Sequence, residues 1–124
     1  MGLHVEKPML KLSEYTNQDS DGNAMLKAHA YQAVNDGFVA AYSTNSGAYK
    51  ILAVYVGSTS DPAGAGDLIF NATSSSSGAN NLVGASGVPV GKGEFFEVTY
   101  TGVDAFVIRW KSLGLTLKKP IDFN

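Results

Sequence analysis

The sequence contains no cysteine, so it can form neither a disulfide framework nor a thiolate metal site. It has only two histidines and one tryptophan. Charged residues make up 16% of the chain, against roughly 25% in ordinary soluble domains. We therefore expect a polar but weakly charged surface, and a fold stabilised by packing or by self-association.

The charge distribution argues against two classes of partner. The net charge is −2, and lysine and arginine do not cluster on any expected strand, which excludes a nucleic-acid footprint. No stretch reaches the ~20 apolar residues of a membrane span, and Met1 to Lys7 lacks the apolar core of a secretory signal. We expect no membrane insertion, and synthesis in the cytoplasm without export.

Motifs for catalysis, cofactors and metals are also missing. His4 and His29 stand apart from any nucleophile motif, and Gly91-Lys92-Gly93 lacks the surrounding residues of a phosphate loop. Asp61 and Asp67 flank a Pro/Gly-rich loop, where capping of turns is a simpler role than paired acid catalysis. We expect no enzymatic activity and assign no cofactor.

The segment from Asn17 to Gly22 resembles the first half of a calcium loop. Ala28 stands where that loop needs its bidentate glutamate, so we interpret the segment as a polar turn and assign no metal.

Strand signals recur about every ten residues, with turn residues between them and no useful helical period. Two hairpins are predicted. The first joins strands at Met25 to Ala33 and Phe38 to Ser43, and the second runs from Gly87 to Trp110. In the second, Phe96, Val98 and Tyr100 alternate on one face, and Phe106, Ile108 and Trp110 on the face opposite, which predicts that Trp110 is buried.

Tyr49 to Val56 is apolar on both faces and predicts a central strand or one at a subunit interface. A shorter strand is expected at Leu68 to Phe70, between loops at Gly57 to Asp67 and at Asn71 to Gly87. The expected fold is an all-β antiparallel sandwich or jelly-roll-like module.

Three segments define the expected organisation. Residues 1–23 form an extended N-terminal arm, 24–114 the β-sandwich module, and 115–124 a C-terminal tail that adds an edge strand, either here or in a neighbouring subunit. A purely solvated arm would not need apolar residues, so we expect this arm to anchor the module through Leu3, Val5, Met9, Leu10 and Leu12.

Three short segments carry a family resemblance: Asp36-Gly37-Phe38-Val39, Pro89-Val90-Gly91-Lys92-Gly93 and Trp110-Lys111-Ser112-Leu113-Gly114. Together they resemble the small β-modules at the tips of tailed-bacteriophage fibres. The resemblance implies a non-enzymatic virion protein, a homo-oligomer with three subunits, and contacts with other capsid or tail proteins. The chain has no fibre shaft, so we expect capsid decoration, as in a head fibre, ahead of a receptor-binding tail-fibre tip.

A sugar site is the main alternative. Exposed aromatics with asparagines on loops are typical of glycan-binding surfaces, and the candidates here are Tyr49, Asn71, Asn80 and Asn81. They fit a fibre tip that recognises host-surface glycan, and equally a free, lectin-like carbohydrate-binding module.

Overall fold

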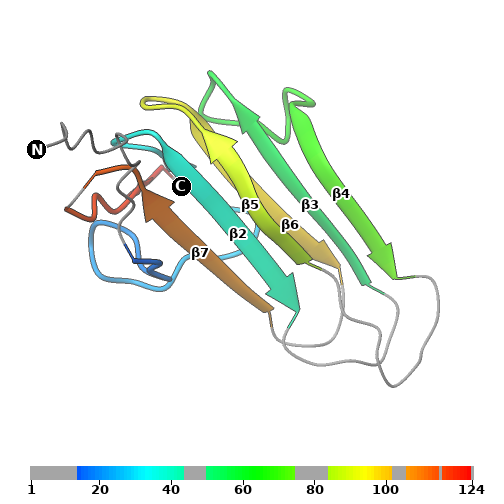
Figure 1. Cartoon of the computed structure of the whole chain (residues 1–124). Helices are drawn as coiled ribbons and strands as arrows, with labels where there is room; N and C mark the ends of the chain where they lie inside the picture. The colour runs from blue at the N-terminus through cyan, green and yellow to red at the C-terminus, as the bar shows by residue number, and fades with distance from the viewer. Residues whose placement is uncertain (1–13, 44–49, 75–83, 102–105, 115, 124) are drawn as a thin grey trace, which may run out of the picture.

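The computed structural model describes residues 14–43, 50–74, 84–101, 106–114 and 116–123. These residues form eight β-strands and no helix. The strands are β1 (Ala30–Gln32), β2 (Gly37–Ser43), β3 (Lys50–Gly57), β4 (Leu68–Ser74), β5 (Gly84–Val90), β6 (Phe95–Thr101), β7 (Phe106–Ser112) and β8 (Ile121–Asp122). They build two antiparallel sheets, in the orders β4-β3-β6-β1-β8 and β5-β2-β7. The expected all-β sandwich is confirmed. Figure 1 shows the three strands of the smaller sheet, β5, β2 and β7, side by side.

Successive strands mostly change sheet. Among the described strands only β3 and β4 are both consecutive and paired; every other connection crosses from one sheet to the other. Thr16 forms an isolated antiparallel bridge with Trp110 on the outer edge of β7, which adds a one-residue fourth strand to the smaller sheet. Repeated crossing between a five-stranded and a three-stranded layer resembles the connectivity of a jelly roll.

Both predicted hairpins are therefore wrong in their pairing. β6 pairs with β3 and β1, whereas β7 pairs with β2 in the other sheet. The first predicted hairpin fails in the same way, because β1 and β2 also lie in different sheets, and its first strand is only three residues long. The Asn35 to Gly37 turn does reverse the chain, but the strand that follows it, β2, lies in the opposite sheet. Most of the turn expected at Thr101 to Asp104 falls outside the described residues. The Gly91 to Gly93 turn likewise joins β5 to β6 across the sandwich.

The predicted inward faces are confirmed. Trp110 is fully buried, and its indole stacks on the Phe96 ring of the opposite sheet at a centroid distance of 5.4 Å. Phe96 in turn stacks on Tyr31 at 5.7 Å, so a column of rings joins the two layers. The Trp110 Nε1–H donates to the Lys118 carbonyl at 2.8 Å, which satisfies its one polar atom.

The central strand was predicted correctly, whereas the bounds of one predicted loop are wrong. β3 lies between β4 and β6, as its two apolar faces predicted. The loop expected at Asn71 to Gly87 is wrong at both ends, because β4 continues to Ser74 and β5 begins at Gly84. Register with β3 extends β4 through residues that have little strand propensity of their own.

One end of the sandwich is tied together by Asp36. Its carboxylate accepts the Lys92 backbone N–H at 2.7 Å, and its carbonyl accepts the Leu113 N–H at 2.8 Å. The turns that follow β1, β5 and β7 therefore meet at one residue. All three segments quoted for the family resemblance contribute to this junction.

Residues 14–23 belong to the sandwich rather than to an arm. Thr16 and Trp110 exchange two backbone hydrogen bonds, of 2.8 and 2.7 Å. Asp19 is buried and its carboxylate accepts the N–H groups of Asp21 and Asn23, which forms the expected polar turn. The boundary at residue 23 lies too far along the chain; the anchoring residues Leu3, Val5, Met9, Leu10 and Leu12 fall outside the described residues.

This boundary can be tested by truncation. Deleting residues 1–13 removes none of the contacts described above, so the free energy of unfolding of this truncation is the reference. Deleting residues 1–18 should lower it by on the order of 2 kcal/mol, because Trp110 loses both backbone partners at Thr16. Urea unfolding of the two truncations and the full chain measures the difference; equal stability of both truncations would show that the bridge contributes nothing.

The C-terminal tail adds an edge strand to its own subunit. β8 pairs with β1, which places it at the end of the larger sheet. Pro120 is fully buried, and the Ser20 N–H donates to its carbonyl at 2.8 Å. The tail therefore also packs against the N-terminal segment.

Candidate functional site

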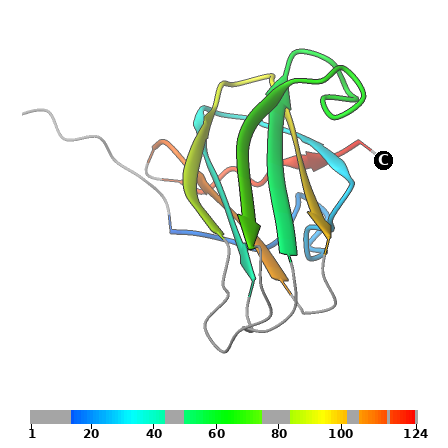
Figure 2. The ribbon, with the colours of Figure 1, turned by 90° about the vertical axis from the view of Figure 1, so that its right-hand side faces the viewer.

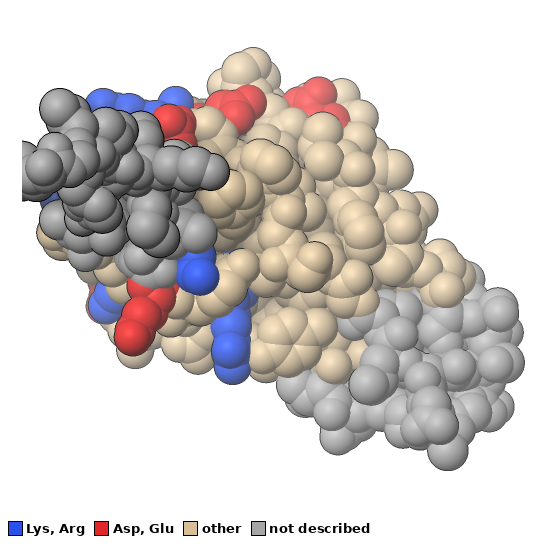
Figure 3. Space-filling view, in the orientation of Figure 1, with Lys and Arg blue, Asp and Glu red and all other residues tan. Residues whose placement is uncertain are grey.

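The charged side chains are unevenly placed. Figure 3 shows them gathered over β7 and the neighbouring part of the chain and along the upper rim, while the surface over β5 and β4 is uncharged. Neither strand contains a charged residue. The molecule thus presents a charged surface and an uncharged one.

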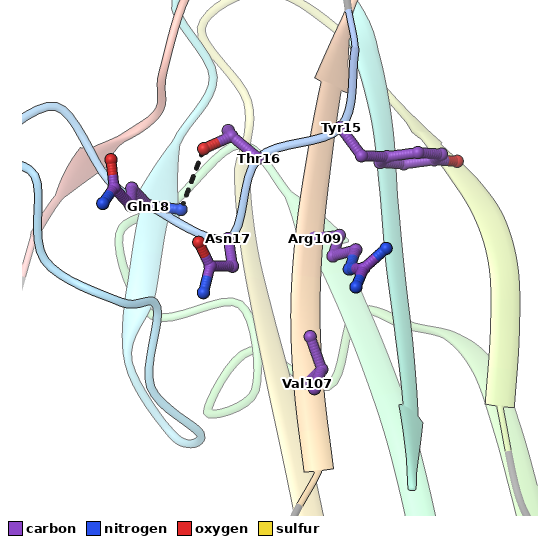
Figure 4. A pocket seen from close by; sticks show the side chains of 6 residues that line it. All are labelled: Tyr15, Thr16, Asn17, Gln18, Val107 and Arg109. Carbon is purple, nitrogen blue, oxygen red and sulfur yellow. Dashed lines mark hydrogen bonds between the residues drawn. The ribbon is translucent and has the colours of Figure 1, made fainter. Parts of the chain in front are cut away.

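A depression of about 540 Å³ lies on the charged side, at the outer edge of the smaller sheet. Its lining residues come from β7 and from the N-terminal segment bridged to it; they are Tyr15, Thr16, Asn17, Gln18, Val107 and Arg109. Figure 4 shows Tyr15 and Arg109 on one side of β7, with Asn17 and Gln18 on its other side in that view.

Local contacts hold this surface in place. The Tyr15 hydroxyl donates to the Ser86 carbonyl at 3.2 Å, so its ring reaches across to β5. Lys111 Nζ lies 4.6 Å from the centre of the Tyr15 ring, and the Arg109 guanidinium lies 5.4 Å from that of Tyr42. Both distances are within the range of cation–π attraction. The aromatic rings are fixed before any ligand arrives.

The depression also has polar groups, two of which already take part in hydrogen bonds within the chain. The Gln18 N–H donates to the Thr16 hydroxyl at 3.2 Å, and Lys119 Nζ donates to the Gln18 side-chain oxygen at 3.0 Å. Amides, a hydroxyl and a guanidinium beside an aromatic ring are groups that bind sugar hydroxyls. Chemically, the depression can hold a polar, hydroxyl-rich ligand.

A second polar group lies on the outer face of the larger sheet. Glu97 is 8% exposed, with the 57–67 loop over it. Burial, followed by repulsion from Asp61, raises the pKa of the Glu97 carboxyl above its ordinary 4.5; the Ala63 N–H and His29 partly offset this. Because Glu97 is buried, we expect its ionisation to affect the stability of the fold rather than the binding of a substrate.

Glu97 should therefore make stability depend on pH. A carboxyl whose pKa is higher in the folded state stabilises fully below pH 4.5, and that stabilisation is lost as pH rises through the folded pKa. Glu97→Gln cannot ionise, so it should be more stable than the wild type at neutral pH, and the difference should shrink below pH 4.5. Urea unfolding at both pH values measures this.

Asp21→Asn is the matched control, because Asp21 is exposed and lies at the polar turn. It should change stability little at either pH. A Glu97→Gln variant that is less stable than the wild type at neutral pH would contradict the prediction and show that the carboxylate bond to Ala63 outweighs burial.

The predicted turn-capping role fits the contacts of Asp61. Asp61 accepts the Gly64 N–H at 3.0 Å, and a Cβ added at Gly57 would meet the Asp67 carboxylate. His29 Nδ1 lies 3.6 Å from Oδ1 of Asp122 in β8. Within the described part of the chain, no group of three metal-ligating side chains occurs, and no helix is long and apolar enough to cross a membrane.

Of the four predicted ligand residues, the structure describes Asn71. Asn71 lies on the edge strand β4, exposed, rather than in a loop. Tyr49, Asn80 and Asn81 fall outside the described residues. The depression was missed because its residues 15–18 have no strand pattern; the one available signal was an aromatic followed by two amides.

Comparison of the chain with protein-family models, curated protein sequences and solved structures finds no match.

Proposed function

We propose that this protein is a non-enzymatic structural module exposed on a tailed-phage particle, where it decorates the capsid and contacts other virion proteins. The observation that carries the proposal is the uncharged surface over β4 and β5. Depletion of charged residues marks the core of protein–protein interfaces. A rigid two-layer sandwich with one such surface is suited to assembly.

Two further observations support this assignment. The three segments that resemble fibre-tip modules meet at Asp36, so in this chain they form one structural junction rather than scattered matches. Residues 1–13 precede the sandwich and contain apolar residues, as an anchor to another virion protein requires. Deleting them should leave the fold intact and abolish incorporation into the particle.

The test is to locate the chain on purified phage particles. Mass spectrometry first establishes whether the particles contain it, and electron microscopy with an antibody against the module then gives its position. Label on the capsid supports decoration, and label at the tail tip replaces it with receptor binding. Absence of the chain from the particles overturns both.

Glycan binding is the second candidate function, and the depression beside Tyr15 favours it. Tyr15→Ala and Arg109→Ala should each weaken binding to host-surface glycan without unfolding the sandwich, since both side chains lie on its outer surface. Ser86→Ala is the control, because only the Ser86 carbonyl is used by Tyr15. Equal glycan binding by all three variants would remove this site from consideration.

A further inference from the structure

The sandwich has four sheet edges, and three of them are protected. Thr16 covers the outer edge of β7 with two backbone hydrogen bonds. β8 is only two residues long and follows Pro120. β5 contains Pro89, which has no N–H to donate, and its register with β2 shifts between Val39 and Ala41. Short strands, prolines and irregularities are the means by which proteins keep edges from pairing.

β4 has little of this protection. It is seven residues long, contains neither proline nor a charged residue, and faces the viewer in Figure 2. Its one irregularity is a register shift near its start, opposite Val54 and Tyr55. Leu68 and Ile69 are 47% and 58% exposed. A long, uncharged, partly apolar edge of this kind is expected to be covered by another chain.

The backbone groups of β4 that face outward follow from the hydrogen-bond alternation. In an antiparallel pair, every second residue exchanges both hydrogen bonds with a given neighbour. The Val56 N–H donates to the Asp67 carbonyl at 3.0 Å, so even-numbered residues of β3 direct their backbone groups toward β4.

The far side of the sheet gives the same answer independently. The Ala28 N–H donates to the Val98 carbonyl at 2.8 Å, so even-numbered residues of β6 face β1 and odd-numbered ones face β3. Thr99 of β6 is opposite Ala53, which places the odd-numbered residues of β3 toward β6.

The hydrogen-bonded pairs between β3 and β4 are therefore Lys50 with Ser74, Leu52 with Ala72 and Val54 with Phe70. Asn71 and Thr73 must then direct their N–H and C=O groups away from the sheet. No described strand lies beyond them. These groups form an unused row of donors and acceptors.

We propose that a second copy of this chain pairs with β4 in an antiparallel, twofold-symmetric contact centred on Asn71. Asn71 is the midpoint of β4, so a twofold there overlaps all seven residues of both strands. The central residue is also one whose backbone groups face outward, as a hydrogen-bonded central pair requires. The two larger sheets then become one continuous sheet.

A second copy of the chain meets no like-charge repulsion along β4. Each chain carries a net charge of −2, but β4 itself is uncharged, so the contact brings no like charges opposite each other. The antiparallel arrangement places the two copies of Asp67 at opposite ends of the paired β4 strands. Isologous contacts of this kind are the commonest in homo-oligomers. The contact does not depend on the virion assignment.

Mass and cross-linking test the proposal. The full chain should sediment as a dimer, and Thr73→Pro, which removes an outward N–H but no bond to β3, should weaken dimerisation about ten-fold or more. Thr73→Val keeps that N–H and should remain dimeric. Circular dichroism and thermal unfolding of the proline variant establish that it is folded.

Because the chain has no cysteine, single-cysteine variants report the register directly. Asn71→Cys should give a covalent dimer on mild oxidation or with a short thiol cross-linker, since the two Cα atoms of such a pair lie about 5.5 Å apart. Thr99→Cys, on the same face but two strands from the edge, should not. A monomer, a trimer, or cross-linking through Thr99→Cys in place of Asn71→Cys would overturn the proposal.

Discussion

Replacing Trp110 by alanine should unfold the protein or leave it barely folded. The side chain is fully buried, stacks on Phe96 across the two sheets, and donates to the Lys118 carbonyl. Removing a large buried aromatic costs about 3–5 kcal/mol. The free energy of unfolding of native proteins is usually about 5–15 kcal/mol. The loss is therefore close to the whole stability of a domain at the low end of that range.

Trp110→Phe is the matched control. Phenylalanine keeps a ring against Phe96 but loses volume and the N–H donor to Lys118, so its cost should be smaller than that of alanine. Urea unfolding followed by circular dichroism compares the variants. Wild-type fluorescence adds a direct check, because the single tryptophan should emit at short wavelength and resist aqueous quenchers. A red-shifted, freely quenched emission would contradict the buried position.

The alternation of side chains predicted the faces of strands correctly, because that period is a local property of the extended backbone. Phe96 and Trp110 were both placed inward and are both buried. Pairing between strands was not predictable in the same way. A turn such as Asn35-Asp36-Gly37 reverses the chain whether the next strand joins the same sheet or the opposite one. Here the choice is supported by the bond between Asp36 and Lys92, 56 residues away.

The candidate site was harder to predict from the sequence for a related reason. Residues 14–18 have no periodic pattern, because their conformation is set by the backbone of Trp110 and not by a strand of their own. Asn71 was assigned to a loop since Asn-Ala-Thr-Ser contains poor strand formers, whereas pairing with β3 holds it in β4. In both places a distant strand decides the structure and local propensity does not.

Among the glycines of the described residues, Gly37 should be the least replaceable. A Cβ at this position would clash with the Lys111 carbonyl and would lie only 2.6 Å from Cζ2 of the Trp110 indole. Neither the paired backbone of β7 nor a buried indole can move aside cheaply. Adding atoms to a well-packed core typically costs about 1–3 kcal/mol. We expect Gly37→Ala to fall at the upper end of that range or beyond it.

Gly87→Ala is the matched control for Gly37→Ala. Gly87 is also in a strand of the smaller sheet, but the nearest atoms to an added Cβ are the Tyr15 hydroxyl at 3.8 Å and Phe38 Cβ at 4.0 Å. The Gly87→Ala substitution should change the free energy of unfolding of the protein by no more than about 0.5 kcal/mol. Equal effects of the two substitutions would show that general strand propensity, rather than the close approach at Gly37, sets the cost.

A double-mutant cycle separates the two clashes at Gly37. In a Trp110→Phe background the outer indole atoms are gone, but the Lys111 carbonyl remains where it is. Gly37→Ala should then cost less than in the wild type, with a coupling energy of about 0.5–3 kcal/mol between the two positions. If the cost is unchanged, the carbonyl of Lys111 alone excludes a side chain, and the requirement for glycine comes from the pairing of β2 with β7 rather than from the tryptophan.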